Sequence, residues 1–190
     1  TTYLFGDTSR EKKVVVSNVS PLLNPHDEEV AVIGYSGVFP KSNTTLEYWN
    51  NILDGKECIS HLSKEECLAL GVSEDTLRQE NYIASGGIIS DIDKFDAIFW
   101  EKSPKDAEVM DPQVRLFLQQ VWQAIEMAGC INKRNDDVIS VFAGGGFDNY
   151  FVNHIMKNSS YQGSIFESYM LACKDLLATR TSYLLNLQGT

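Results

Sequence analysis

The side chains of this chain best suited to nucleophilic or metal chemistry are its cysteines and histidines: Cys58, Cys67, Cys130, Cys173, His26, His61 and His154. None of them stands in a nucleophile motif or at the spacing of a catalytic triad. Cys58, His61 and Cys67 are near one another in the sequence, but a structural zinc site has tightly spaced ligand pairs and needs a fourth ligand. The sequence therefore predicts no metal site, and the wide spacing of the cysteines favours reduced thiols over disulfides.

Two glycine-containing turns follow apolar runs and invite comparison with phosphate-binding loops. A dinucleotide fingerprint has glycine at its first, third and sixth positions and then a helix. The turn that begins at Gly34 has Ser36 and Phe39 at the third and sixth positions, and Pro40 follows at once. The triple glycine at 144–146 is not followed by a lysine-bearing helix at phosphate-loop spacing. Neither turn indicates a nucleotide, but a glycine run lets backbone approach another chain, a ligand or a tight corner closely.

The composition disfavours several classes of partner. A formal net charge of −10 at pH 7 opposes nonspecific binding to nucleic acid or to an anionic membrane. No apolar run approaches the roughly 20 residues that a membrane span requires, and no signal peptide is visible. With 190 residues, 43% of them hydrophobic and 22% charged, the sequence is typical of one globular domain. The widely spaced cysteines favour a cytoplasmic protein with reduced thiols.

The strongest helical pattern lies in the middle of the chain. A short helix is predicted to begin after Ser103 and to end near Met110, because the residue before a proline avoids the helical region. Asp111 and Pro112 then begin a second helix, whose apolar residues recur at steps of three and four until Gly129 supplies a left-handed cap. The pattern alone predicts a core helix that packs on a sheet.

Shorter patterns surround this helix pair. Residues 46–53, 64–70 and 174–185 have helical spacing, whereas 30–33 and 137–143 are continuous apolar runs typical of buried parallel strands. This alternation predicts an α/β fold with an unfinished parallel sheet.

The first 29 residues differ from the rest of the chain. Prolines and an acidic run break regular structure there, although residues 12–16 have the composition of a short strand. We expect residues 1–29 to be a linker or docking leader and residues 30–190 to form the folded part.

Taken in order, the segments of residues 30–190 resemble the N-terminal half of β-ketoacyl synthases, the ketosynthase domains of modular polyketide synthases. The most specific segment is Met110-Asp111-Pro112-Gln113-x-Arg115-Leu116, a signature of this half of the family. The other matching segments are the G-x-S-x-x-F-P turn at 34–40, the W-x-x-L-x-x-G helix at 49–55, the stretch from Gly86-Gly87 to Phe99, Asp148-x-Tyr150, residues 175–183 and Leu187-x-Gly189.

The resemblance implies a thiolase-like fold of layered αβαβα type, a homodimer and decarboxylative Claisen condensation. In such an acyltransferase a cysteine takes the growing acyl chain from a phosphopantetheine arm, and two histidines assist decarboxylation of a malonyl unit. The phosphopantetheine arm of an acyl carrier protein is then the substrate carrier, and no cofactor is bound directly.

The resemblance also implies which residues matter. The family's nucleophile lies a short strand beyond the turn that ends this chain, and both histidines lie later still, so no catalytic residue is assigned and the chain alone is expected to be inactive. Asp148, Tyr150 and Phe151 are candidates for the acyl tunnel or the dimer seam, with ordinary loop and packing roles as the alternative. Asp111, Pro112, Gln113 and Arg115 form a structural motif.

Two interpretations therefore remain open. In the first, the chain is the N-terminal portion of a ketosynthase whose C-terminal remainder lies on the same or a separate chain. In the second, it is a non-catalytic interaction or docking half-domain that assembles with a complementary chain. Because two buried strands with few partners would expose unpaired edges and apolar surface, both interpretations predict association.

Overall fold

The structure is a computed structural model, which describes residues 30–133, 137–158 and 164–189. The predicted leader at 1–29 and the predicted strand at 12–16 lie outside these described residues. The chain divides into two compact units, Thr1–Ala31 and Val32–Thr190, and the architecture below belongs to the second unit.

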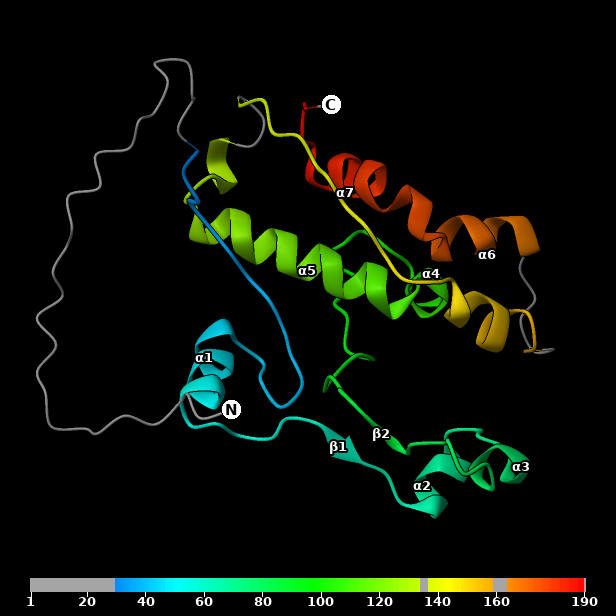
Figure 1. Ribbon diagram of the computed structural model, residues 1–190. Helices are drawn as coiled ribbons and strands as arrows, with labels where there is room; N and C mark the ends of the chain where they lie inside the picture. Colours follow the sequence, from blue (N-terminus) through cyan, green and yellow to red (C-terminus); the bar gives the residue numbers. More distant parts are fainter. Residues whose placement is uncertain (1–29, 134–136, 159–163, 190) are drawn as a thin grey trace, which may run out of the picture. The chain divides into compact units, whose positions relative to one another are not determined.

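Two consecutive helices at the centre of the chain begin and end where the sequence predicts. Helix α4 (Pro104–Val109) has Ser103 as its N-cap, and helix α5 (Pro112–Met127) has Asp111 as its N-cap and Pro112 at its first position (Figure 1). Asp111, the residue before Pro112, has φ −53° and ψ 134°, outside the helical region, as expected for a residue that precedes a proline. Gly129 has a positive φ of 70° just after α5, which confirms the predicted left-handed cap.

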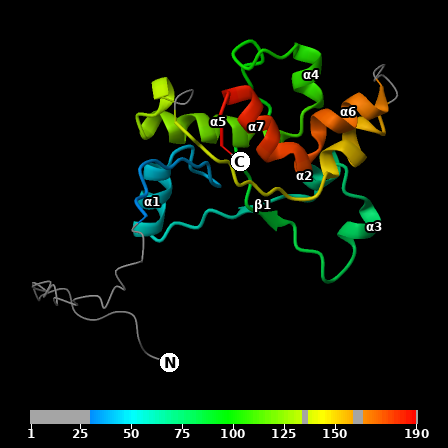
Figure 2. The same cartoon turned by 90° about the horizontal axis from the view of Figure 1, so that it is seen from above.

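The main hydrophobic core forms between α5 and the last helix of the chain. The 3₁₀ helix η3 (Lys174–Leu176) leads into α7 (Leu177–Leu185), as predicted for this stretch, and α7 lies beside α5 in Figures 1 and 2. Apolar side chains from the predicted stripe of α5 pack there against α7 and the turn after it. The buried members of this cluster are Trp100, Met110, Val114, Leu118, Leu177, Leu185 and Leu187.

A second, smaller cluster joins α4 to two later helices. The π-helix η2 (Phe151–Ile155) follows the glycine run, and α6 (Ile165–Ala172) comes next in the chain. Val109 of α4, Phe151 and Ile155 of η2 and Ala172 of α6 are buried together. The sequence predicted a loop leading into a helix for η2, whereas α6 was not predicted.

Residues 45–86 form short elements around a small antiparallel ribbon. Helix α1 (Thr45–Leu53) is capped by Thr44 and followed by Gly55, and α2 (Lys64–Ala69) is capped by Ser63 and followed by Gly71. Both helices lie where the sequence predicts them. Strand β1 (Ser60–His61) pairs with β2 (Ser85–Gly86), with Ser60 opposite Gly86.

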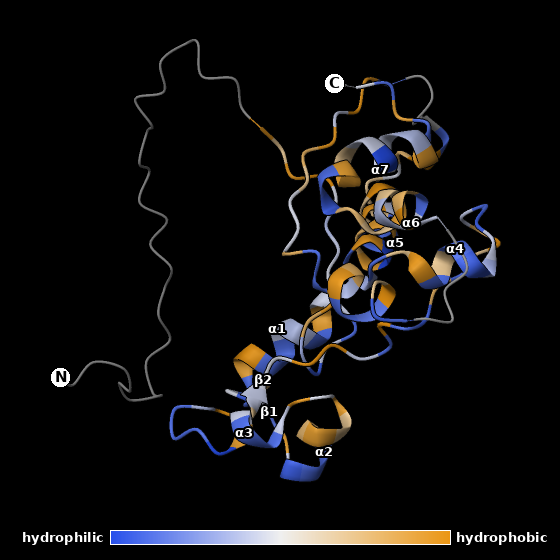
Figure 3. Cartoon of the chain, turned by 90° about the vertical axis from the view of Figure 1, so that its right-hand side faces the viewer, coloured by the Kyte–Doolittle hydropathy of each residue, from blue (hydrophilic) through white to orange (hydrophobic). Residues whose placement is uncertain are grey.

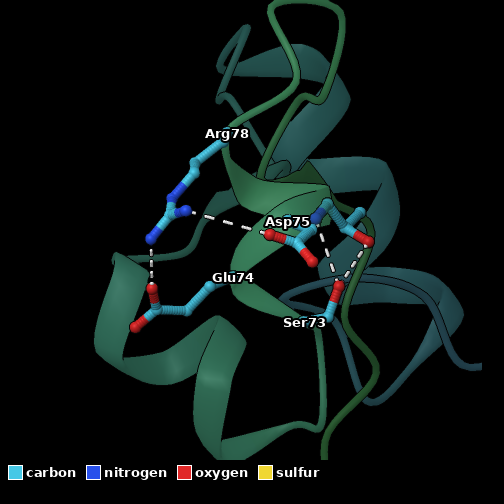
Figure 4. Close-up of polar contacts among 5 residues, drawn as sticks. Ser73, Glu74, Asp75 and Arg78 are labelled. Carbon is cyan, nitrogen blue, oxygen red and sulfur yellow. Dashed lines mark hydrogen bonds and ion pairs between the residues drawn. The ribbon is translucent and has the colours of Figure 1, made fainter.

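Helix α3 (Glu74–Leu77) is a single turn between these strands, and polar side chains close both of its ends. Ser73 caps the first turn by accepting the N–H of Thr76. At the other end the Arg78 guanidinium lies 2.7 Å from the Glu74 carboxylate and 3.8 Å from that of Asp75 (Figure 4). These exposed ion pairs add little stability each, so the cap is the firmer part of the turn.

The two predicted parallel strands are extended but are not paired as strands. In the described part of the chain, the backbone hydrogen bond that reaches 137–143 is the one from the Gly189 N–H to the Ile139 carbonyl, 3.0 Å. The side chains of Val32, Val138 and Phe142 are 84%, 82% and 90% exposed, and Figure 3 shows the hydrophobic colour of the coil that follows the grey leader. The prediction of burial is therefore wrong for this structure, because a strand needs neighbours for its edges and faces.

An apolar hollow of about 490 Å³ separates these two extended segments. Ile33 and Gly34 line it from one segment and residues 137–142 from the other, while the remaining lining comes from one face of α5 with Cys130 and Leu187. None of the described helices is long and apolar enough to cross a membrane.

Candidate functional site

The carboxylate of Asp111 fixes the start of α5. Its Oδ1 accepts the N–H of Gln113 at 2.8 Å, and Pro112 occupies the first helical position, where no N–H is needed. Asp111 is only 3% exposed, and its Oδ2 has no hydrogen-bond partner among the described residues. Burial raises the pKa of this carboxyl, the N–H groups of Gln113 oppose that shift, and the charge of Asp148 adds to it.

Gln113 joins the start of α5 to the glycine loop, which we define as residues 144–148. Its Oε1 accepts the N–H of Gly146 at 2.7 Å, and its Nε2 donates to the carbonyl of Phe147 at 3.4 Å. The backbone comes so close that a Cβ on Gly146 would lie 2.9 Å from Oε1 of Gln113, and one on Gly145 would lie 3.2 Å from Cβ of Lys174. The close approach that the sequence predicts for this run is therefore to neighbouring side chains of the same chain.

Asp148 and Tyr150 are tied to two other helices. The Asp148 Oδ1 accepts the backbone N–H of Lys174, at the start of η3, at 3.1 Å. The Tyr150 hydroxyl donates to the carbonyl of Glu108 in α4 at 2.7 Å, and burial raises its pKa. Together with Gln113, these bonds hold residues 144–150 against α5, η3 and α4.

Arg115 lies one turn after Asp111 and is almost fully buried. Its side chain donates from one terminal nitrogen to the carbonyl of Asp93 at 3.4 Å, while Nε has no partner among the described residues. Arg115 and Tyr150 line a hollow of about 360 Å³ together with residues of 93–97 and α4. The signature motif thus places a buried acid, an amide and a buried guanidinium on one end of α5.

Phe151 lies in the second hydrophobic cluster. It is 7% exposed and meets Tyr169 edge-on, with ring centroids 5.3 Å apart. The structure therefore brings Asp148 and Tyr150 together with the motif residues, whereas Phe151, the first residue of η2, packs in the cluster with residues of α4 and α6.

The cysteines and histidines have separate surroundings. His61 Nδ1 lies 2.7 Å from the Ser85 hydroxyl across the β1–β2 ribbon, and Cys67 is completely buried. Within the described ranges, no group of three or more histidine, cysteine, aspartate or glutamate side chains is arranged to hold a metal ion.

A comparison with protein families identifies the family to which the chain belongs. The model of the family described as "Beta-ketoacyl synthase, N-terminal domain" matches residues 27–190. This chain belongs to that family. The resemblance seen in the signature motif is therefore confirmed over nearly the whole chain.

Curated relatives are polyketide synthases. The chain is 36% identical over 171 residues to a phenolphthiocerol/phthiocerol polyketide synthase of Mycobacterium tuberculosis, a match that covers 86% of this chain and 12% of that protein. It is 33% identical over 187 residues to the polyketide synthase PksN of Bacillus subtilis, a match that covers 96% of this chain and 3% of that protein. The chain thus spans a small part of the length of these relatives.

Solved ketosynthases share the fold. Ketosynthase twelve of the bacillaene polyketide synthase from Bacillus amyloliquefaciens has a TM-score of 0.66 and 32% identity over 84% of this chain and 28% of that one. An oxazolomycin ketosynthase domain from Streptomyces albus has a TM-score of 0.69 and 26% identity over 86% of this chain and 28% of that one. The predicted α/β, thiolase-like fold class is confirmed.

Sequence reasoning missed the contacts of two residues in this region. The sequence identifies Gln113 as a motif residue without indicating its bonds to the glycine loop. For Arg180 it allows either a buried ion-pair partner or a solvated charge, with the solvated charge favoured. The guanidinium of Arg180 is half-buried and donates to the carbonyls of Leu171, at 2.7 Å, and Met170 at the end of α6. The signal for α6 was present in the sequence, since Ser164 followed by Glu167 three residues later is a helix-start pattern.

Proposed function

We propose that this chain is the N-terminal part of a polyketide synthase ketosynthase. With the rest of its domain it catalyses decarboxylative Claisen condensation between an acyl thioester and a malonyl-type extender held on an acyl carrier protein. The observation that carries the proposal is the match of residues 27–190 to the ketosynthase family, with the signature motif folded into a capped helix.

The chain's own contribution to this reaction is positioning. The nucleophilic cysteine and the two histidines belong to the remainder of the domain, and the described residues of this chain build the support beneath them. Asp148, Tyr150 and Phe151 line the acyl tunnel or the adjoining dimer seam, and the acyl chain arrives on a phosphopantetheine arm. The complete domain is a cytoplasmic homodimer.

An acylation experiment tests this proposal. The complete domain is incubated with an acyl-pantetheine thioester, and the mass of each cysteine peptide is measured. We expect one acyl group on a cysteine outside this chain. Acylation of Cys58, Cys67, Cys130 or Cys173, or no acylation of the complete domain, would contradict the proposal.

The second candidate, a non-catalytic half-domain, draws support from the exposed side chain of Val32 and from Val138 and Phe142, which are exposed and line the apolar hollow. This surface requires a complementary chain under either function. A condensation assay distinguishes the two candidate functions. An assembly that forms the 3-ketoacyl product is catalytic, whereas one that forms a stable complex without product is an interaction module.

A further inference from the structure

The side-chain amide of Gln113 makes two bonds that few other side chains reproduce. It accepts from the N–H of Gly146 at 2.7 Å and donates toward the carbonyl of the next residue, Phe147, at 3.4 Å. A carboxylate of the same length offers only the acceptor, and asparagine is one methylene shorter. The backbone of Gln113 is itself fixed, because its N–H is bonded to Asp111 at 2.8 Å.

Among the described residues, Gln113 is the side chain that the structure shows hydrogen-bonded to the backbone of Gly146 and Phe147 in the glycine loop. Gly146 faces the Gln113 amide, while Gly145 faces the stem of Lys174. At the end of the loop, Asp148 accepts the N–H of Lys174, and just after the loop Tyr150 donates to the carbonyl of Glu108. The Gln113 amide thus holds the middle of the loop against the start of α5, and the bonds of Asp148 and Tyr150 hold its end against η3 and α4.

We infer that Gln113 is a positioning residue for acyl-chain selection: its amide holds the glycine loop so that Asp148 and Tyr150 face the acyl chain. This inference rests on the proposed ketosynthase function and adds a residue that governs substrate fit rather than chemistry. Loss of the amide frees the loop and weakens acyl-thioester binding, whereas decarboxylation of the extender, which proceeds at the remainder of the domain, continues.

The kinetic test uses the complete domain with Gln113→Ala, Gln113→Glu and the control Gln119→Ala. Gln119 is matched because it lies on the same helix and also donates to a loop carbonyl, that of Lys94, at 3.3 Å. The probes are short- and long-chain acyl-pantetheine thioesters for acylation and malonyl-pantetheine for decarboxylation. For Gln113→Ala we expect the KM of acylation to rise about tenfold, with the kcat of decarboxylation within about twofold of wild type.

The other variants refine this expectation. Gln113→Glu retains the acceptor for Gly146 and loses the donor, so its KM lies between those of wild type and Gln113→Ala. Gly146→Ala places a Cβ 2.9 Å from Oε1 of Gln113, at a backbone position without positive φ, so the alanine displaces the amide without straining the loop. The same substitution in the Gln113→Ala background meets no amide, and the two effects on KM are therefore less than additive.

Hydrogen exchange provides a readout that is independent of activity. The amide of Gly146 is expected to exchange faster in Gln113→Ala than in wild type or Gln119→Ala. Unchanged acylation KM in Gln113→Ala, or equal losses in acylation and decarboxylation, would overturn the positioning role even if exchange is faster. A wild-type domain that is never acylated would overturn the proposed function and this inference with it, and that outcome is visible before any variant is compared.

Discussion

At the scale of single residues, Asp111 is a helix cap with an unsatisfied oxygen. One carboxylate oxygen holds the first turn of α5, while the other is buried without a partner among the described residues. Ionising a carboxyl in such a place is unfavourable, and burial accordingly raises its pKa. The cap therefore stabilises the helix while the buried charge opposes folding at neutral pH.

Two substitutions separate these effects. Asp111→Ala removes the cap, and we expect it to lower the free energy of unfolding by roughly 1 kcal/mol. Asp111→Asn keeps a capping oxygen without the charge, so its stability at neutral pH is expected to equal or exceed that of wild type. Urea unfolding of the complete domain measures both, and an equal loss in the two variants would show that the charge itself is needed.

The pH dependence follows from the raised pKa of Asp111. When the pKa of a carboxyl is higher in the folded state than in the unfolded chain, its contribution to folding is fully present below the unfolded-state pKa of about 3.9. The contribution is lost as pH rises through the pKa of the folded state. Wild type should therefore lose stability relative to Asp111→Asn as pH rises through the mildly acidic range above that value. The difference between the two unfolding free energies, followed over this range, is the measurement.

At the scale of elements, the sequence predicts helices better than strands. Helix ends carry local signals, and the caps at Thr44, Ser63, Ser103 and Asp111 all lie at the start of helices that the sequence predicts. A strand depends on distant neighbours, so the apolar runs at 30–33 and 137–143 could not reveal from their own residues whether they would be paired. Likewise, the signature motif identified Gln113, but its bonds to residues 33 and 34 positions later could not be predicted from local patterns.

The seating of the first extended segment on α5 depends on one glycine. A Cβ on Gly34 would lie 2.3 Å from the carbonyl oxygen of Ala124 and 3.1 Å from the N–H nitrogen of Ala128, so backbone must move. We expect Gly34→Ala to lower the free energy of unfolding by about 1–3 kcal/mol. Gly144→Ala is the matched control, because nothing lies within 4 Å of its added Cβ. Chemical denaturation of the complete domain measures the free energy of unfolding of both variants. Equal losses in Gly34→Ala and Gly144→Ala would contradict the close approach of Gly34 to α5.

At the scale of the molecule, the exposed apolar segments predict that the rest of the domain stabilises this chain when the two bind. Adding the remainder of the domain in trans to the chain should raise its melting temperature and give one compact species by size-exclusion chromatography with light scattering. Phe142→Ser is a suitable control, because the Phe142 side chain is 90% exposed in the chain alone. The substitution should lower the melting temperature of the complex and leave that of the chain alone unchanged. A stable, monodisperse monomer of the chain alone would contradict this prediction.

The composition of the main core also has a consequence for synthesis on the ribosome. Leu118 of α5 is buried against residues as late as Leu185 and Leu187, so the apolar stripe of this helix is translated well before the side chains that cover it. At roughly 5–20 residues per second, the nascent chain carries an uncovered α5 for several seconds. A chaperone that binds the emerging polypeptide would therefore meet the uncovered apolar face of α5 before α7 is made. Slower translation between the two helices would lengthen this exposure.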